Sequence, residues 1–330
     1  MSDTPITSTL DLDAEGVQHG FLKLPYSHDG SAWGSLMIPI SQVKRGEGPT
    51  ALLTGGNHGD EYEGPIALFD LANRLRAEEV SGRVIIVPAM NHPAFMAGRR
   101  NSPIDGGNMN RVFPGRPDGG VTEKIADYFT RTLLPLADLV ADIHSGGKTL
   151  TFLPFACAHV LEDKAQEARC VAAMEAFNAP YGIMLLEIDS VGMYDQAAEA
   201  IGKTFISTEL GGGGSATART AAIARRGLDN LLKHMGILAG EPEIGPSVRL
   251  DMPDERCFVI SETRGLIDFC ADLGDSVTAG QLIARVYDPE RSGAAAVEYR
   301  AGIDGLFVGR HFPGLVAMGD CIAMVGLPVG

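Results

Sequence analysis

Two side chains with metal-binding chemistry stand close together in a glycine-rich segment. The segment Thr54–Glu61 reads Thr-Gly-Gly-Asn-His-Gly-Asp-Glu, so that two residues separate His58 from Glu61. A turn of this length can direct an imidazole nitrogen and a carboxylate oxygen at one point. Zinc binds these donors, and a catalytic zinc ion combines three protein ligands with one water molecule. The pair therefore predicts two of the three protein ligands of a zinc site.

A candidate third ligand, His144, stands in the segment Asp-Ile-His-Ser-Gly-Gly, directly after an apolar run. A single histidine at the end of a strand is more often structural than metal-binding, so the assignment depends on His58, Glu61 and His144 together. Asp142 falls on the same side of an extended chain as His144, because side chains alternate along a strand. We expect Asp142 to shape the site or support a ligand. His92 follows another predicted strand and can line the same cleft.

A carboxylate that can serve as a base ends a further apolar run. Glu209 closes the run Phe-Ile-Ser-Thr-Glu, and a stretch of glycines follows one residue later. A hydrolytic metal site needs a group that takes a proton from water and returns it to the leaving amine. We assign Glu209 to that role. The glycines also resemble a phosphate-binding loop, but the required Gly-Lys-Ser/Thr pattern is missing, which disfavours that interpretation.

Arginines cluster in a loop rich in glycine and proline between residues 99 and 115. A guanidinium group binds a carboxylate through two parallel N–H donors, so Arg111 with Asn110 is suited to a substrate carboxylate. A second arginine, Arg100 or Arg99, can polarise the scissile carbonyl and stabilise the oxyanion. The alternative for each arginine is an ion pair with a surface carboxylate.

Alternating strands and helices must position these residues. The sequence predicts strands at 51–54, 83–89, 139–143 and 205–208, an edge strand at 34–40, and helices at 65–75, 122–134, 164–178 and 217–235. This order predicts an α/β fold with a mixed, mostly parallel central sheet and helices on both faces. Such sheets build their sites at the carboxyl ends of the strands. We place this catalytic domain at residues 1–245.

The sequence predicts a small all-β domain of short strands at residues 246–330. Two segments there, 265–286 and 305–325, repeat a pattern of strand, Gly-Asp turn and strand. The repeat resembles the halves of lipoyl- and biotinyl-type β-sandwiches, which carry a modified lysine. No lysine follows Lys233, so a swinging-arm carrier is excluded and a structural or gating role remains.

The composition of the chain bears on which kinds of molecule it can bind and on where it is expected to function. The 330-residue chain is 45% hydrophobic and has a formal net charge of −15, which argues against binding nucleic acid or anionic membranes. No apolar run reaches the roughly 18 residues of a membrane span, and the N-terminus lacks the apolar core of a secretory signal. The five scattered cysteines form no Cys-x-x-Cys pair. We expect a globular cytoplasmic protein without disulfides or a thiolate zinc site.

Four motifs occur in an order that resembles the succinylglutamate desuccinylase/aspartoacylase family of the zinc carboxypeptidase superfamily. They are His58-x-x-Glu61, Asn110-Arg111-x-Phe-Pro-Gly, Asp142-x-His144-Ser and Glu209. With the β-rich C-terminal region, the resemblance covers most of the chain.

The resemblance implies a role for each matched residue. One Zn²⁺ ion per subunit would be bound by His58, Glu61 and His144, and Glu209 would act as general base and acid. Asn110 and Arg111 would bind the α-carboxylate of the substrate. The spacing of the family's oxyanion arginine differs here, and Arg100 is its first counterpart, with Arg99 second.

Two longer segments, residues 11–40 and 54–72, narrow the resemblance further. They resemble family members that remove acetate from N-α-acetyl-L-2,4-diaminobutyrate in ectoine degradation, which implies a small N-acetylated amino acid substrate and a bacterial cytoplasmic homodimer. The γ-ammonium of that substrate requires a carboxylate, and Glu187, Asp189 and Asp195 are candidates by position. The alternatives are a deacylase for N-acetylaspartate or N-succinylglutamate, a zinc carboxypeptidase, and a non-catalytic binding protein.

Overall fold

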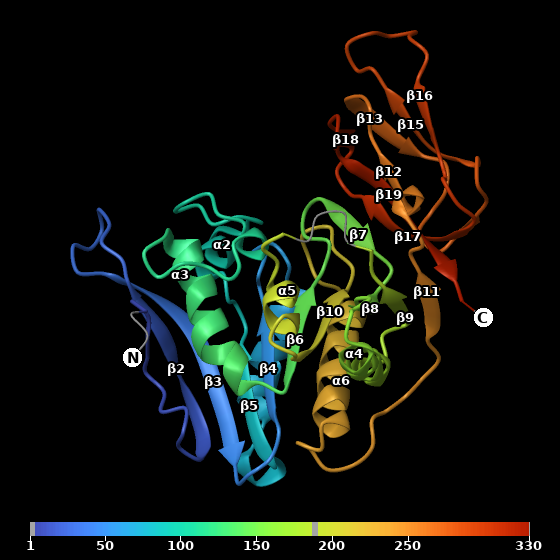
Figure 1. The fold of residues 1–330 in the computed structure, drawn as a ribbon. Coiled ribbons are helices and arrows are strands. Elements are labelled where there is room, and N and C mark those ends of the chain that lie inside the picture. The colour runs from blue at the N-terminus through green and yellow to red at the C-terminus, as the bar shows by residue number, and fades with distance from the viewer. Residues whose placement is uncertain (1–3, 187–190, 330) are drawn as a thin grey trace.

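A computed structural model describes residues 4–186 and 191–329, and its centre is a mixed β-sheet (Figure 1). The adjacent strands β5, β4, β6 and β10 of this sheet are parallel. The strands from the N-terminus to the last parallel pair are β1 (Thr7–Ser8), β2 (Gly16–Pro25), β3 (Ser35–Arg45), β4 (Thr50–Gly55), β5 (Gly82–Val87), β6 (Leu139–His144), β8 (Phe155–Ala158), β9 (Tyr181–Met184), β10 (Thr204–Glu209) and β11 (Val248–Asp251).

The register of the central strands brings the predicted site residues to one edge. Thr54 of β4 lies opposite Asp142 of β6, and His144 lies opposite Glu209 of β10. Strands β4 and β6 are buried along their whole length, as their continuous apolar runs predict for parallel strands covered on both faces. The carboxyl ends of three parallel strands therefore meet where the site was expected.

Helices cover both faces of the sheet, as the alternating pattern predicts. On one face α1 (Glu63–Arg74), α4 (Lys164–Phe177) and α6 (Ala218–His234) pack on one another and on alternate residues of the strands. On the other face, α3 (Val121–Tyr128) and α5 (Tyr194–Glu199) cover the remaining strand residues, and the short α2 (His92–Ala97) follows β5. Asp163 caps α4 and Thr217 caps α6 through their side chains, which satisfies otherwise unpaired N–H groups.

The strand predicted at 34–40 was wrongly placed at the edge of the sheet. It extends as β3 from Ser35 to Arg45 and lies between β2 and β5. The ten-residue strand β2 pairs with it along its whole length. An alternating burial pattern in β2 shows why the sequence concealed this: half of its side chains face solvent, so no apolar run marks it.

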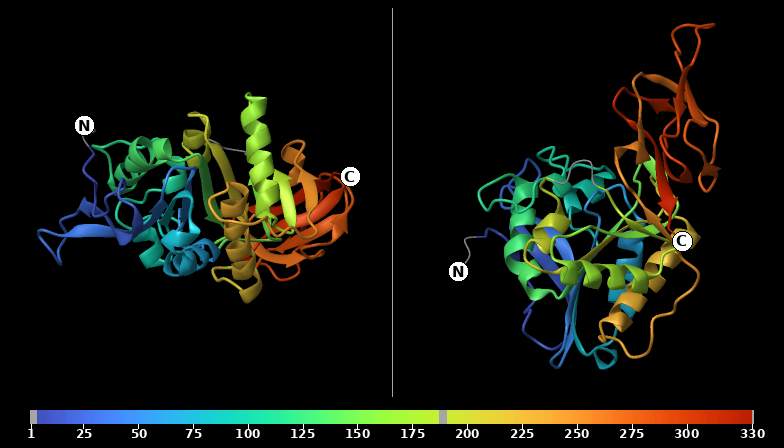
Figure 2. Two further views of the ribbon diagram at one scale, coloured as in Figure 1. Left: turned by 90° about the horizontal axis from the view of Figure 1, so that it is seen from below. Right: turned by 45° about the vertical axis from the view of Figure 1, so that its right-hand side comes forward.

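The C-terminal region is all-β and projects from the sheet–helix body (Figure 1, Figure 2). Strands β13, β15, β16 and β18 form a separate antiparallel sheet. Strand β17 pairs with β7 of the catalytic region, and β19 pairs with β11. The bounds are β7 (Leu150–Phe152), β12 (Phe258–Ile260), β13 (Gly265–Phe269), β14 (Ser276–Val277), β15 (Leu282–Tyr287), β16 (Val297–Arg300), β17 (Gly305–His311), β18 (Leu315–Val316) and β19 (Cys321–Pro328). The region is thus joined by backbone hydrogen bonds to a segment that lies next to the site.

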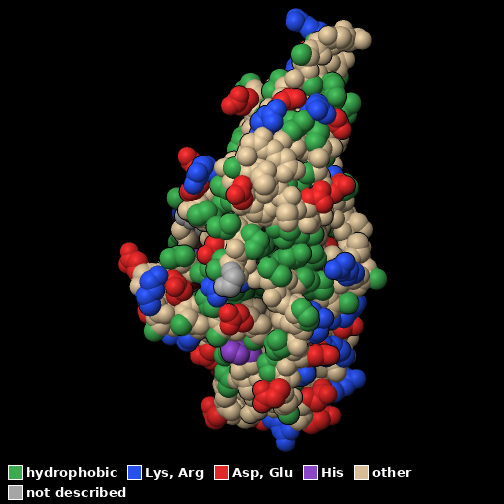
Figure 3. Space-filling view, turned by 90° about the vertical axis from the view of Figure 1, so that its right-hand side faces the viewer, with side chains coloured by type: hydrophobic (Ala, Val, Ile, Leu, Met, Phe, Trp, Pro, Cys, Tyr) green, Lys and Arg blue, Asp and Glu red, His purple; other side chains and the backbone are tan. Residues whose placement is uncertain are grey.

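Acidic and basic side chains are interspersed over the face shown in Figure 3. Hydrophobic side chains gather towards the middle of that face (Figure 3). Among the residues that the structure describes, no helix combines the length and the apolar character needed to cross a bilayer.

Candidate active site

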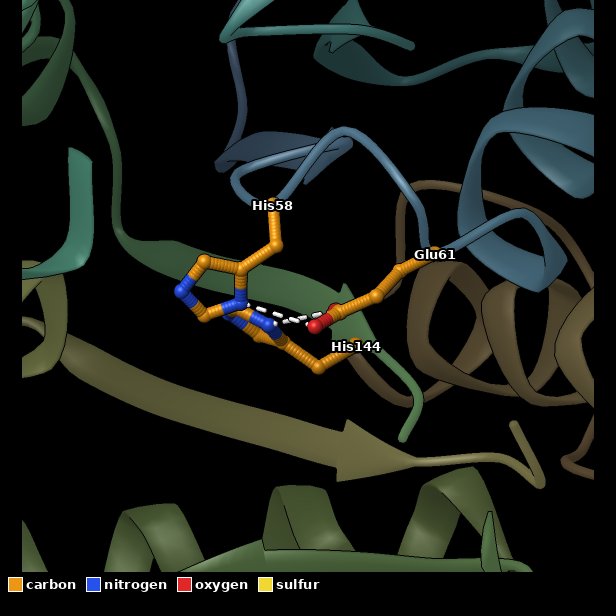
Figure 4. Close-up of side chains that lie close together, drawn as sticks. All are labelled: His58, Glu61 and His144. Atoms are coloured by element: carbon orange, nitrogen blue, oxygen red, sulfur yellow. Dashed lines mark hydrogen bonds and ion pairs between the residues drawn. The ribbon is translucent and has the colours of Figure 1, made fainter. Parts of the chain in front are cut away.

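The three predicted metal ligands converge on one point (Figure 4). His58 and Glu61 come from the loop between β4 and α1, and His144 is the last residue of β6. Oε1 of Glu61 lies 2.8 Å from Nδ1 of His58, and its Oε2 lies 2.8 Å from Nδ1 of His144. All three side chains are buried. This cluster is a candidate metal site in which each residue offers one donor atom.

Glycines allow the loop after β4 to turn back towards the site. Gly56 has φ +62°, in the left-handed region that favours glycine. A side chain on Gly59 would collide with the backbone of Ala94 in α2. The Gly-Gly-Asn-His-Gly sequence therefore places His58 and Glu61 by backbone geometry as well as by spacing.

Both imidazoles are oriented through the nitrogen that faces away from Glu61. Nε2 of His144 lies 2.7 Å from Oδ2 of Asp142, and Nε2 of His58 lies 3.2 Å from Oδ1 of Asn108. If each Nε2 carries the proton and donates it, each Nδ1 is left with a lone pair for a metal ion. This is the usual arrangement of histidine ligands and their supporting acceptors.

Asp142 is itself fixed by two further donors. Its Oδ1 accepts a hydrogen bond from the Thr54 hydroxyl at 2.7 Å, and its Oδ2 accepts one from Nδ2 of Asn57 at 2.8 Å. The expectation that Asp142 supports a ligand agrees with these contacts. Sequence reasoning did not single out Asn57 or Asn108, although Asn57 directly precedes His58.

The electrostatics of the protein groups match a cation site. Burial lowers the pKa of His58. Burial alone would raise the pKa of Glu61, but the charges of His58 and His144 hold it below its usual range. Burial opposes the charge on His144, yet Asp142 and Glu61 hold its pKa well above the usual value. A positive charge is thus favoured between these carboxylates.

The donor set also fits zinc in size. Tetrahedral zinc bonds of about 2.1 Å set neighbouring donors about 3.4 Å apart, so shifts of about half an ångström from the observed 2.8 Å contacts would admit the ion. Two imidazoles and one carboxylate form the ligand set of many catalytic zinc sites.

Glu209 faces the same cavity from the end of β10. The cavity has a volume of about 180 Å³ and is also lined by His58 and His144. Oε2 of Glu209 is buried and has no hydrogen-bond partner among the described residues. Burial, with the nearby charge of Glu61, raises the pKa of Glu209 to about 8. A carboxyl group with such a pKa can both accept and donate a proton near neutral pH.

The structure distinguishes the two arginines that sequence reasoning left open. Nη1 of Arg100 lies 3.3 Å from Nδ1 of His58 and 3.7 Å from Oε1 of Glu61, and Arg100 lines the cavity. Arg99 is not among the lining residues. Arg100 is therefore the arginine that is placed beside the metal ligands.

Asn110 and Arg111 line the cavity as well. Oδ1 of Asn110 accepts a hydrogen bond from the backbone N–H of Tyr194 at 2.9 Å, which leaves its amide N–H groups available. Nη1 of Arg111 donates to the backbone carbonyl of Asn110 at 2.7 Å. The two residues predicted to bind a carboxylate thus stand together at the cavity.

The other residues that the sequence suggested for the site differ in whether they line the cavity. His92 begins α2 and does not line the cavity. Glu187 and Asp189 lie outside the described residues, whereas Asp195 lines the cavity. Two larger hollows, of about 730 and 770 Å³, contain none of the predicted site residues. The chemistry is therefore concentrated in the smaller cavity.

The catalytic part of the chain matches a known protein family. The model of the succinylglutamate desuccinylase/aspartoacylase catalytic domain matches residues 47–235. The chain belongs to this family. The resemblance inferred from the four motifs is thereby confirmed, and the matched range contains every predicted site residue.

Individual members of the family are similar over nearly the whole chain. The N-α-acetyl-L-2,4-diaminobutyric acid deacetylase of Halomonas elongata is 60% identical over 98% of this chain and 95% of its own length. The product-bound structure of the ectoine utilization protein EutE (DoeB) of Ruegeria pomeroyi is 63% identical, covers 98% of this chain and 99% of that chain, and superimposes with a TM-score of 0.96.

A third relative carries a different name. A succinylglutamate desuccinylase from Silicibacter sp. TM1040 is 62% identical, covers all of both chains and also superimposes with a TM-score of 0.96. These similarities confirm the predicted α/β fold with a β-rich C-terminal region. They also support an enzyme of the deacetylase and amidohydrolase group, the class to which the named relative belongs.

Proposed function

We propose that this protein is a zinc-dependent amidohydrolase that removes acetate from N-α-acetyl-L-2,4-diaminobutyrate in ectoine degradation. The observation that carries the proposal is the convergence of His58, Glu61 and His144 at a cavity shared with Glu209, whose buried Oε2 has no hydrogen-bond partner in the described part of the chain. The names of two relatives at 60% and 63% identity support the choice of substrate. L-2,4-Diaminobutyrate and acetate are the expected products.

His58, Glu61 and His144 would hold one Zn²⁺ ion per subunit. When bound, zinc supplies Lewis-acid chemistry, which polarises a carbonyl group and makes water more acidic. Asp142 and Asn108 orient the two imidazoles through their Nε2 atoms.

The chain's own residues then perform the proton transfers. Glu209 takes a proton from the attacking water and later delivers it to the departing α-nitrogen of the linear amide. Its raised pKa, about 8, suits both tasks. Arg100 stabilises the negative charge that develops on the acetyl oxygen, because its guanidinium group stands beside the metal ligands.

Asn110 and Arg111 bind the α-carboxylate and so fix the scissile amide in the cavity. Both line the cavity with His144 and Glu209. Their fixed position favours substrates that carry a free carboxylate next to the amide nitrogen.

The second candidate is a related deacylase that acts on N-succinylglutamate or N-acetylaspartate, because one relative at 62% identity is named a succinylglutamate desuccinylase. A zinc carboxypeptidase would use the same ligands and carboxylate clamp. The cavity of about 180 Å³ favours a small acyl amino acid over a peptide.

We also propose a cytoplasmic homodimer with residues 1–245 as catalytic domain and 246–330 as β-rich domain. The pairing of β17 with β7, whose residues Leu150 and Phe152 line the cavity, supports a role of the β-rich domain in narrowing the site.

The test measures release of the free α-amino acid from N-α-acetyl-L-2,4-diaminobutyrate, N-acetyl-L-aspartate, N-succinyl-L-glutamate and a dipeptide. The proposal expects the highest kcat/KM for the diamino substrate. A higher value for either acidic substrate would favour the second candidate.

A further inference from the structure

We infer that the carboxylate of Asp195 binds the γ-ammonium group of the substrate and sets the preference for a cationic side chain. This inference rests on the proposed function and assigns a residue to the part of the substrate that the other site residues leave unbound. Asp195 is the second residue of α5 and lines the same cavity as His144 and Glu209.

Asp195 is nearly buried and has no cationic partner among the residues that the structure describes. Only 4% of the residue is exposed. Oδ1 accepts a hydrogen bond from the backbone N–H of Gln196, and no Lys, Arg or His side chain within the described residues forms an ion pair with it. Buried carboxylates are rarely left unpaired, because desolvation opposes their charge. A cation supplied by the substrate would complete this site.

The position of Asp195 relative to the carboxylate clamp is fixed by backbone contacts. The N–H of Tyr194, the preceding residue, donates to Oδ1 of Asn110 at 2.9 Å. The N–H of Phe113 donates to the carbonyl of Gly192 at 2.9 Å. A side chain at Gly192 would collide with the carbonyl of Arg111. The segment that carries Asp195 is therefore packed directly on the residues that would bind the α-carboxylate.

The substrate has matching dimensions. In 2,4-diaminobutyrate the ammonium nitrogen is three bonds from Cα, about 4 Å away when the side chain is extended. An amino acid whose carboxylate contacts Asn110 and Arg111 therefore presents its ammonium group close to the clamp, on which the Asp195 segment packs.

The charges in the cavity favour such a carboxylate. Arg100 and Arg111 line it together with Asp142 and Glu209, and a bound dication would add positive charge beside the metal ligands. The carboxylate of Asp195 would lower the positive potential that a substrate ammonium meets. The same carboxylate would repel the acidic side chains of N-acetylaspartate and N-succinylglutamate, so one residue would distinguish the proposed substrate from its rivals.

The experiment compares Asp195→Asn with the wild type on a charged and an uncharged substrate. These are N-α-acetyl-L-2,4-diaminobutyrate and N-acetyl-L-2-aminobutyrate, which has a methyl group in place of the aminomethyl group. Asparagine keeps the size of the side chain and the acceptor for Gln196. We expect kcat/KM for the charged substrate to fall about 50- to 500-fold, mainly through KM, and that for the uncharged one to change less than about threefold.

Two further measurements distinguish a loss of substrate specificity from a loss of activity caused by damage to the fold. Glu199→Gln is the matched control, because Glu199 is a carboxylate of the same helix that pairs with His159 at 2.9 Å and does not line the cavity. It should keep the wild-type preference. Asp195→Asn should also raise kcat/KM for N-acetyl-L-aspartate by about tenfold, a gain that a merely damaged enzyme would not show.

Two results would overturn the inference. The first is that the wild type is active and prefers the charged substrate, and that Asp195→Asn keeps this preference. The other is loss of the preference in Glu187→Gln or Asp189→Asn but not in Asp195→Asn. A wild type that releases no acetate from the diamino substrate would instead overturn the proposed function itself, so the two failures are distinguishable.

Discussion

Substitution of Asp142 tests whether its carboxylate orients the proposed metal ligand His144 and so strengthens zinc binding. Its carboxylate contacts Nε2 of His144 at 2.7 Å, Nδ2 of Asn57 at 2.8 Å and the Thr54 hydroxyl at 2.7 Å. In Asp142→Asn, the amide oxygen can take the place of Oδ2 and accept from His144 and Asn57. The new NH2 group then faces Thr54, whose hydroxyl can accept it and donate to the carbonyl of Ala141. The acceptor for His144 and Asn57 is thus kept, one of the two new N–H donors is paired with Thr54, and the main change is loss of the negative charge.

The expected magnitude follows from this geometry. A hydrogen bond to a charged acceptor is worth about 1 to 1.5 kcal/mol more than one to a neutral acceptor, which corresponds to about a tenfold loss of zinc affinity. Asp142→Ala instead leaves the donors of His144 and Asn57 without an acceptor, at about 1 to 3 kcal/mol for each buried group. We therefore expect a loss of about a hundredfold or more for the alanine variant.

Zinc affinity is measured by competition with a coloured chelator at fixed pH. Asp127→Asn is the control, since Asp127 of α3 is equally buried but pairs with Arg131, one turn further along the chain, and does not line the cavity. Equal affinities for the wild type and the alanine variant would refute the role given to Asp142. An asparagine variant as weak as the alanine variant would refute the hydrogen-bond rearrangement.

Three more predictions concern the catalytic groups. Glu209→Gln should bind zinc like the wild type while kcat falls by about 10² to 10⁴; near-normal turnover would show that another group moves the proton. Arg100→Ala should lower kcat about 10²-fold or more with little change in KM, whereas Arg99→Ala should keep a kcat near that of the wild type. A lower kcat for Arg99→Ala than for Arg100→Ala would reverse the assignment. Asp142 and Glu61 hold the pKa of His144 well above its usual value, which favours the protonated form of this residue in the metal-free protein. Zinc binding should then release about one proton and strengthen as pH rises; calorimetry in buffers of different ionisation enthalpy would show no buffer dependence if His144 were already neutral.

The convergence of His58, Glu61, His144 and Glu209 could be predicted from the sequence because local rules place them. His58 and Glu61 follow a buried strand through a glycine turn, and His144 and Glu209 end two neighbouring parallel strands. In a parallel sheet these ends meet at one edge, so the order of apolar runs was enough to bring the four residues together.

Other parts of the site depend on contacts that spacing does not reveal. Asn108 reaches His58 from a loop fifty residues away, and no rule connects an asparagine in a glycine-rich loop to a given imidazole. The choice of Arg100 over Arg99 depends on which side chain the loop turns inward. Asp195 was one of three acidic candidates, and only its position on α5 shows that it lines the cavity. The interior position of β3 was missed because its neighbour β2 alternates between buried and exposed residues.

The most direct test of the whole account follows acetate release from N-α-acetyl-L-2,4-diaminobutyrate by a single preparation as purified, after removal of metal by a chelator, and after addition of one equivalent of zinc. The account predicts activity that is lost with the metal and restored by zinc in the wild type, but not restored in His144→Ala. Undiminished acetate release from fully metal-free protein would contradict it.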